Sequence, residues 1–135
     1  MSDFKLHPRL EADTAFVTDL PLCRVLAMND ARYPWLLLVP RREATELHDL
    51  NARDRALLIE QIALASEKLK ALTGAAKINV GALGNLVPQL HIHVIARNAS
   101  DAAWPGPVWG HGTPIPYAPD ALKDFVKRLG TAIAP

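Results

Sequence analysis

Short segments of the chain are rich in β-branched and apolar residues and alternate loosely with polar ones, a pattern typical of β-strands. One run, Trp35–Val39, is apolar throughout and is followed by Pro40, as expected for a strand that is covered on both faces. Pro21 marks a break between the first two segments. The predicted strands are, in chain order, Ala15–Thr18, Leu22–Met28, Trp35–Val39, Lys77–Leu83 and Gln89–Ala96.

A different periodicity predicts one long helix from about Ala52 to Leu72. Apolar residues recur there at spacings of three and four and form one stripe: Leu58, Ile62, Ala65, Leu69 and Leu72. Asn51 is a plausible N-cap, and Gly74 follows the last turn as a stop signal. A shorter closing helix is predicted from Pro119 to Leu129.

The order of these elements predicts the fold class. Residues 97–119, between the last strand and the closing helix, carry several prolines and glycines and form a long irregular loop, which is usually functional or disordered. Strands and helices do not alternate strictly, and this favours an α+β fold with an antiparallel sheet of about five strands. The length of 135 residues predicts a single domain over residues 1–135.

Composition and charge narrow the possible partners. The formal net charge is +1, so nothing draws the chain over long range to a nucleic-acid polymer or an anionic membrane. No apolar run is long enough to span a bilayer, and no secretory signal is visible. Cys23 is the only cysteine, which excludes an internal disulfide and fits a reducing compartment. We therefore expect a cytoplasmic protein.

The most informative segment for chemistry is Gln89-Leu90-His91-Ile92-His93-Val94. Side chains alternate across a strand, so Gln89, His91 and His93 are expected on one face and the apolar residues on the other. A neutral imidazole is a nucleophile at neutral pH, because its ordinary pKa is near ~6.5. A second imidazole one step along the strand could donate to a phosphoryl oxygen.

Two other interpretations of this segment stay open. His91 and His93 could lie on a solvated strand face without a chemical role. They could also hold zinc together, since two histidines at this spacing can reach one metal ion. His48, His111 and Glu43 are available as a third ligand, but no local spacing joins them to the pair.

Several other residues are candidates for ligand binding, each with a structural alternative. Asn79 and the turn that contains Gly84 and Asn85 precede the histidine strand, and a glycine turn can offer backbone N–H groups to an anion. Asp30 could accept hydrogen bonds from a ribose diol or simply form an Asx turn. Trp104 and its neighbour Trp109 could stack on a base or pack within the loop.

The chain resembles the histidine-triad (HIT) family, whose motif alternates histidine with hydrophobic residues on one strand. The segment Gln89–Val94 matches this motif with glutamine in the first of three positions. Leu26–Asp30, followed by Leu36–Pro40, looks like the family's nucleoside-binding strands and turn. Gly84 matches the glycine that begins the phosphate-side loop, and Trp104-Pro105-Gly106 looks like the Trp-Pro segment of the Hint branch.

The resemblance implies a two-step nucleotidyl transfer. His91 would attack the α-phosphorus of a nucleotide conjugate, such as a diadenosine polyphosphate or a phosphoramidate. Water or another acceptor would then release the nucleotide. His93 would contact the phosphate and the leaving group, and a neighbouring backbone carbonyl would fix the tautomer of His91. Asp30, with Asn29, would lie by the ribose, and Asn79 near the phosphate.

The resemblance also implies a homodimer and no catalytic metal or cofactor. The apolar stripe of the long helix and the two tryptophans of the loop need cover, so we expect the interface to use the long helix and the Trp-Pro loop. The chain departs from the family at three positions. Gln89 replaces the first histidine, Leu86 stands where many members have a hydroxyl near the leaving group, and Trp35 stands about where the Hint branch has an additional histidine.

The prediction is therefore a nucleotide-phosphate hydrolase or nucleotidyl transferase with a purine nucleotide conjugate as substrate. Its rivals are a HIT protein that binds nucleotides with negligible turnover and a metal-dependent hydrolase that uses His91 and His93.

Overall fold

The computed structural model describes residues 4–134 and places one antiparallel sheet between two unlike layers. The strands are β1 (Thr14–Asp19), β2 (Cys23–Met28), β3 (Trp35–Pro40), β4 (Lys77–Gly81) and β5 (Ile92–Arg97). Their order across the sheet is β1-β2-β3-β5-β4, and every neighbouring pair is antiparallel. The predicted α+β class and the antiparallel sheet of five strands are confirmed.

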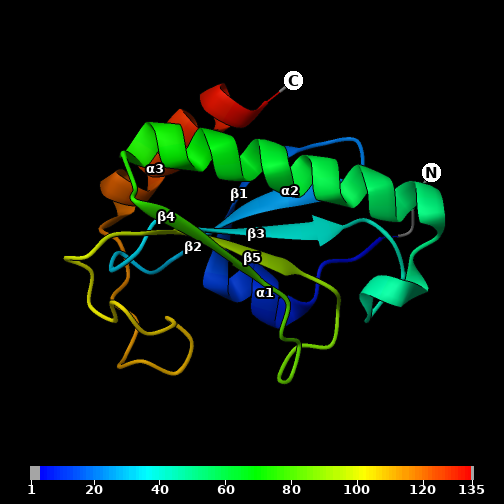
Figure 1. The fold of residues 1–135 in the computed structure, drawn as a ribbon, viewed down its shortest axis with the longest axis horizontal. Helices are drawn as coiled ribbons and strands as arrows, with labels where there is room; N and C mark the ends of the chain where they lie inside the picture. The colour runs from blue at the N-terminus through cyan, green and yellow to red at the C-terminus, as the bar shows by residue number, and fades with distance from the viewer. Residues whose placement is uncertain (1–3, 135) are drawn as a thin grey trace.

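Two helices, α2 (Ala52–Thr73) and α3 (Pro119–Ile133), cover one face of the sheet (Figure 1). Asn51 caps α2 by accepting a hydrogen bond from the Asp54 N–H, and Gly74 ends the helix, both as predicted. The predicted stripe faces the sheet: Leu58, Ala65 and Leu69 are buried, and Ile62 and Leu72 are packed against the same core. The helix α3 extends four residues beyond its predicted end.

The opposite face of the sheet is covered by residues 4–13, which precede β1, and by the irregular residues 98–118 (Figure 1). That first segment contains a short helix, α1 (Pro8–Asp13), which the sequence analysis did not predict. His7 caps it by accepting a hydrogen bond from the Arg9 N–H, and Pro8 occupies its first turn. A short 3₁₀ helix, η1 (Leu47–Asp49), precedes α2.

The two faces of β5 contact different cores. Its even-numbered residues, Ile92, Val94 and Ala96, pack under α2 and α3 with Leu36 and Leu38 of β3. Its residue Ile95 packs on the other face with Leu37 and with the aromatic residues of β3 and the turn before it. The histidine-bearing face is therefore the face that no long helix covers.

The predicted start of the last strand is wrong. The strand was expected to begin at Gln89, but β5 begins at Ile92. Its ladders begin with Ile92 opposite Leu38 and His93 opposite Gly81, so no pairing precedes Ile92. Residues 89–91 make other contacts, including a hydrogen bond from the Leu90 N–H to the Ala44 carbonyl. His91 consequently lies just outside the sheet, with its side chain beside that of His93.

No helix among residues 4–134 is long and apolar enough to cross a membrane.

Candidate active site

His91 has one ring nitrogen fixed by the backbone. Its Nδ1 lies 2.7 Å from the carbonyl oxygen of Gln89. A carbonyl oxygen only accepts, so Nδ1 carries the proton and donates it, and Nε2 keeps a free lone pair. The side chain is 7% exposed, which leaves little room for the ring to turn away. A buried imidazole with an unprotonated Nε2 is suited to nucleophilic attack.

His93 has the opposite arrangement. The indole Nε1 of Trp35 lies 3.0 Å from Nδ1 of His93. Tryptophan only donates, so Nδ1 of His93 accepts, and the proton of the neutral ring is on Nε2. Burial, with a contribution from nearby His91, lowers the pKa of His93 to about 3, so this imidazole is neutral at neutral pH. The two histidines are thus held in complementary tautomers.

The two imidazoles lie together under an indole from the long irregular segment. The ring centroids of His91 and His93 are 5.0 Å apart, and Trp109 packs edge-on against His93 at 5.4 Å. Trp109 also lies over Gly81 of β4, where a Cβ would be only 2.9 Å from its ring. The absence of a side chain at Gly81 lets Trp109 seat on the sheet beside His93.

Both histidines line a cavity of about 440 Å³ on this face of the sheet. Its wall is largely apolar and aromatic, with two arginines, Arg9 and Arg32, among its charged groups. A concave, mostly apolar site with a few polar groups is the usual form of a small-molecule pocket. The residues that line it are Arg9, Leu10, Asp13, Met28, Arg32, Trp35, Leu37, Leu83, Gly84, Asn85, Leu86, Val87, His91, His93, Val108, Trp109, Gly110, His111, Gly112 and Pro114.

The predicted turn before the histidines forms one edge of this cavity. Gly84, Asn85 and Leu86 all line it. Gly84 has a φ of 76°, a conformation that side chains disfavour, so glycine is required for the turn itself. Leu86 is 78% exposed and therefore lies at the rim rather than in the depth of the cavity.

Gln89 takes part through its backbone. Its side chain points to the first residues of the chain, where Oε1 accepts from the His7 N–H at 2.8 Å and Nε2 donates to the Lys5 carbonyl at 2.9 Å. Its carbonyl is the partner of His91. The amide therefore anchors the N-terminal segment beside the site, while the carbonyl sets the tautomer of His91.

Asn29 and Asp30 were expected beside a ribose, but the structure occupies their polar atoms with protein groups. Asp30 is 1% exposed and holds Arg32 by its guanidinium and its backbone N–H. Burial raises the pKa of Asp30, but the hydrogen bonds from Arg32 and from the Ile115 N–H outweigh it and hold the pKa below its usual value. Asn29 accepts from the Tyr117 N–H. Neither residue lines the cavity.

Asp30 holds Arg32, and Arg32 lines the cavity. The Arg32 guanidinium binds Asp30 at 2.8 Å and also donates to the His111 carbonyl at 2.6 Å. It thereby joins the turn after β2 to the far end of the irregular segment. Arg32 was not predicted as a site residue, because its contacts with the buried Asp30 and with the His111 carbonyl arise only in the fold.

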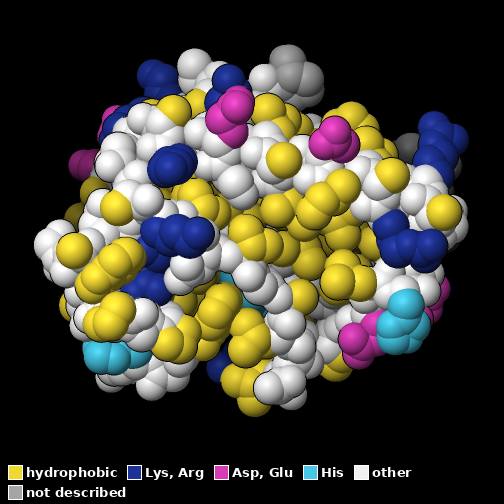
Figure 2. Space-filling view, in the orientation of Figure 1, with side chains coloured by type: hydrophobic (Ala, Val, Ile, Leu, Met, Phe, Trp, Pro, Cys, Tyr) yellow, Lys and Arg dark blue, Asp and Glu magenta, His cyan; other side chains and the backbone are white. Residues whose placement is uncertain are grey.

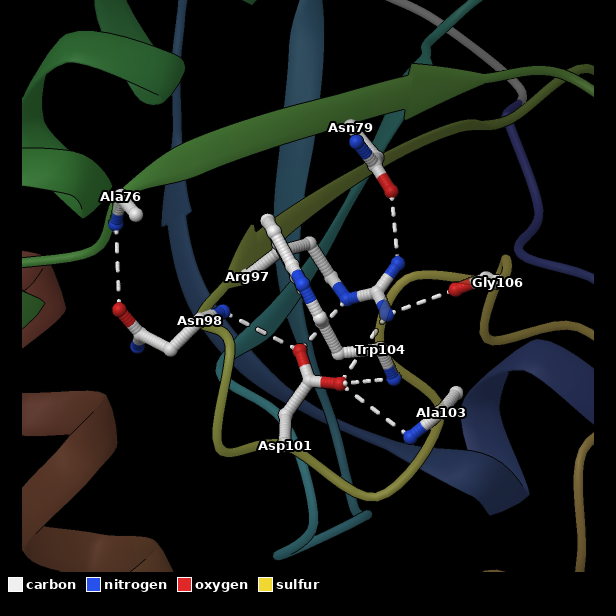
Figure 3. A network of polar contacts seen from close by, with 8 residues as sticks. All are labelled: Ala76, Asn79, Arg97, Asn98, Asp101, Ala103, Trp104 and Gly106. Carbon is white, nitrogen blue, oxygen red and sulfur yellow. Dashed lines mark hydrogen bonds and ion pairs between the residues drawn. The ribbon is translucent and has the colours of Figure 1, made fainter.

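Asn79 and Trp104 belong to a neighbouring polar network centred on Arg97 (Figure 3). Arg97 is 1% exposed and donates to Asn79 Oδ1 at 2.8 Å, to both carboxylate oxygens of Asp101 and to the Gly106 carbonyl. The Asp101 carboxylate also accepts from the backbone N–H groups of Ala103 and Trp104. The network pins the start of the irregular segment to the end of β5, and neither Asn79 nor Trp104 lines the cavity.

Among residues 4–134, no three His, Cys, Asp or Glu side chains come together in a way that could hold a metal ion. The two active-site histidines therefore lack a third ligand of these types within that range.

Comparisons with known proteins agree on one family. The family model of the HIT domain matches residues 9–100. A histidine triad protein from Bradyrhizobium japonicum is 49% identical, with a TM-score of 0.93, over 96% of this chain and 98% of that one. A histidine triad protein from Sinorhizobium meliloti is 46% identical, with a TM-score of 0.94, over 96% and 97% of the two chains. One from Marinobacter aquaeolei is 43% identical, with a TM-score of 0.90, over 97% and 98%. No curated protein matches the chain.

Proposed function

The chain belongs to the HIT domain family, and from this premise we propose that it is a nucleotide-phosphate hydrolase or nucleotidyl transferase that works through a nucleotidyl-histidine on His91. The observation that carries the proposal is the hydrogen bond of 2.7 Å between His91 Nδ1 and the Gln89 carbonyl. It leaves the Nε2 lone pair of a cavity-lining imidazole free for attack.

In the first step, the Nε2 lone pair of His91 forms a bond to the α-phosphorus of a purine nucleotide conjugate. The bond from phosphorus to the leaving group breaks, and its electron pair departs with that group. The ring of His91 becomes a cation, which the Gln89 carbonyl stabilises through Nδ1–H. In the second step, water attacks the phosphorus, the P–N bond breaks, its electron pair returns to His91, and the water proton goes to solvent.

The cavity supplies the means of binding such a substrate. Its apolar wall, with Val108 and Trp109, suits a purine, and Arg9 and Arg32 provide positive charge for phosphate groups. The turn at Gly84 and Asn85 lies at the edge that also holds His91. In this proposal Arg32 takes the place of Asp30 at the ligand, because the Asp30 carboxylate is already held by Arg32.

The decisive test is to trap the intermediate. The protein is mixed with a dinucleoside polyphosphate, quenched within one turnover, and analysed by intact-protein mass spectrometry and peptide mapping. We expect one nucleoside monophosphate on His91. His91→Ala should abolish the adduct and lower kcat by at least about a hundredfold, with nucleotide binding retained.

His48→Ala is the matched control, because His48 is an exposed histidine on η1. It should leave the adduct and the rate unchanged. A His91→Ala protein that is folded and fully active would contradict the proposal.

A second candidate is a nucleotide-binding protein with negligible turnover. Leu86 favours it, because an exposed leucine at the cavity rim offers no hydroxyl to a leaving group. The two candidates separate when calorimetric binding of a nucleoside monophosphate is measured beside turnover of a dinucleoside polyphosphate and an adenosine phosphoramidate. Tight binding, with turnover no faster than that of His91→Ala, would establish the second candidate.

We also propose that the protein is a homodimer. Hydrophobic side chains gather on the face that α2 and β4 present (Figure 2). A groove of about 370 Å³ there is lined by residues of both elements, and Ile59 and Val80 are 61% and 49% exposed. β4 is an edge strand, so its outer backbone groups are available to pair with a second copy.

The interface predicted from the sequence combined the long helix with the Trp-Pro loop. The exposed apolar side chains of Ile59 and Val80 instead favour an interface that combines the long helix with β4. Light scattering should give a molar mass twice that of the chain. In the Val80→Lys protein the measured mass should fall to that of a single chain. A monomer at micromolar concentration would contradict the dimer.

A cytoplasmic location remains part of the proposal. Cys23 is buried and cannot form an internal disulfide, and burial raises the pKa of its thiol to about 12, so it is poorly reactive. Cell fractionation with an antibody against the chain would test this.

A further inference from the structure

Trp35 packs in the core and also makes a directional hydrogen bond to a histidine of the cavity. It begins β3, is 7% exposed, and belongs to the core on the site face. Its indole donates to His93 Nδ1 at 3.0 Å, while its ring packs edge-on against Tyr33 at 6.2 Å. The strand and the neighbouring ring fix the direction of the N–H, so the hydrogen bond to His93 is built into the fold.

We propose that Trp35 is a positioning residue that holds His93 as a neutral Nε2–H donor, and that it thereby restricts the enzyme to nucleotide conjugates whose leaving group departs as an anion. This inference rests on the proposed function, because it concerns the leaving group of the same nucleotidyl transfer.

A neutral His93 avoids a second positive charge beside His91. When His91 carries the nucleotidyl group, its ring is a cation, and His93 lies 5.0 Å away between ring centroids. A second cation there would be repelled in a buried site. The Trp35 N–H occupies the nitrogen of His93 that would otherwise take a proton. His93 can then stabilise phosphoryl oxygens through Nε2–H without adding a competing positive charge.

A neutral His93 also has no proton to give to a leaving group. An amine leaving group must be protonated as it departs, whereas a phosphate leaves as a stable anion. A neutral imidazole whose Nδ1 already accepts a hydrogen bond could release the Nε2 proton only by becoming an imidazolate. His93 is therefore a donor of hydrogen bonds and no source of protons. The class of substrate that fits is a dinucleoside polyphosphate or a comparable phosphate-linked conjugate rather than a phosphoramidate.

The remaining charged and titratable groups on the cavity wall are few. Arg9, Arg32, Asp13 and His111 line it together with His91. None of these groups makes a hydrogen bond to His93, whose ring contacts Trp35, His91 and Trp109. Burial and His91 lower the pKa of His93, whereas the choice of its tautomer is set by the hydrogen bond from Trp35.

The test begins with the unmodified protein. Histidine side chains labelled with ¹⁵N are followed by NMR between pH 5 and 8. We expect His93 to show an unprotonated Nδ1 and a protonated Nε2 throughout, with no titration. A proton on Nδ1, or titration of His93 in this range, would overturn the inference without any variant.

Trp35→Phe then removes the N–H and keeps an aromatic ring. We expect His93 to populate both tautomers and to begin to titrate at the acidic end of the range. The turnover rate on phosphoramidate relative to dinucleoside polyphosphate should rise about two- to tenfold at acidic pH, which corresponds to the free energy of one hydrogen bond. Trp109→Phe is the matched control for the spectrum, since Trp109 contacts the same ring without donating to it; His93 should keep its tautomer.

The outcomes separate this inference from the proposed function. Absence of turnover on both substrates would overturn the function, and the substrate restriction with it, while the spectrum alone decides the role of Trp35. Turnover on both substrates, with a rate ratio that does not change in a folded Trp35→Phe protein, would overturn the restriction and leave the nucleotidyl transfer standing.

Discussion

The two faces of the sheet are built in different ways. The face under α2 and α3 is covered by apolar side chains, with Gln61 as a buried polar exception that accepts from the Cys23 N–H. The other face carries the two histidines of the cavity and the buried ion pairs Asp30–Arg32 and Arg97–Asp101. The single strand β5 contributes side chains to both faces of the sheet, because Val94 points to the first face and His93 to the second.

This difference reflects what each face has to hold. Regular helices pack by volume, so the helix face needs only well-fitting apolar side chains. The site face holds residues 98–118, which have no regular secondary structure and whose backbone groups need partners. Two carboxylates, Asp30 and Asp101, supply several of these partners at once. Stability there depends on a few polar groups, and the same groups place the cavity wall.

The strongest challenge to this contrast is to break the Arg97 network. Arg97→Met would leave the Asp101 carboxylate, whose side chain is 9% exposed, without its cation. Removing one partner of a buried ion pair typically costs about 3–5 kcal/mol, so we expect a loss of that order in the free energy of unfolding. Urea denaturation followed by circular dichroism measures it.

The double variant Arg97→Met/Asp101→Asn should recover part of the loss, because no unpaired charge remains. If Arg97→Met costs less than about 1 kcal/mol, the site face is not held by this network. Nucleotide binding by the remaining folded protein should also weaken, since Trp109 follows the released segment.

On the helix face, Leu69→Ala tests packing by volume. Leu69 is fully buried, so the free energy of unfolding should fall by about 2–5 kcal/mol. Turnover per folded molecule should be unchanged, because the cavity lies on the other face. Ile59→Ala on the same helix is the control, and it is measured in the Val80→Lys protein so that the dimer does not contribute. Because Ile59 is 61% exposed, this substitution should change the free energy of unfolding by no more than about 0.5 kcal/mol.

The dependence of stability on pH should come partly from the site face. The hydrogen bond and charge of Arg97 lower the pKa of Asp101 to about 2, so this carboxylate is stabilising above its unfolded pKa and loses that contribution as the pH falls toward 2. The loss is on the order of 2 kcal/mol between about pH 5 and pH 2. Asp101→Asn should flatten the stability curve in this window, and an unchanged slope would remove Asp101 from the account.

The smallest expected effect is that of Leu86→Ser. A hydroxyl near the leaving group would help amines more than phosphates, so phosphoramidate turnover should rise more than polyphosphate turnover. Because Leu86 is 78% exposed, solvent competes for that hydrogen bond, and we expect a change of about two- to fivefold in the rate ratio. Equal changes in both rates would place Leu86 away from the leaving group.

The elements with a clear period could be predicted from the sequence, and the site only in part. The long helix follows from its stripe and from Asn51 and Gly74. The strand at His93 follows from the alternation of polar and apolar residues. Its start at Ile92 depends on where β3 and β4 end, and the sequence pattern of a single strand does not contain that information. The helix α1 was missed because it is short and only Leu10 in it is buried.

At the site, His91, His93 and the turn at Gly84 were predictable because they are neighbours in the sequence. Arg32, Trp35 and Trp109 meet them only through the fold, so sequence spacing cannot report their contacts. Asp30 was predicted either to accept hydrogen bonds from a ribose diol or to form an Asx turn, and its partners in the fold decide its role: the carboxylate holds Arg32 and the Ile115 N–H. Long-range partners of this kind are fixed by tertiary structure alone.

The placement of the tryptophans has an optical consequence. Of three tryptophans, Trp35 and Trp109 pack against the ring of His93, at 5.7 Å and 5.4 Å between centroids, and Trp104 lies over Arg97. Indole emission shifts with local polarity. Two of the three tryptophans therefore report on the surroundings of one neutral histidine, and a ligand that enters the cavity should change the colour and intensity of the light that the unlabelled protein itself emits.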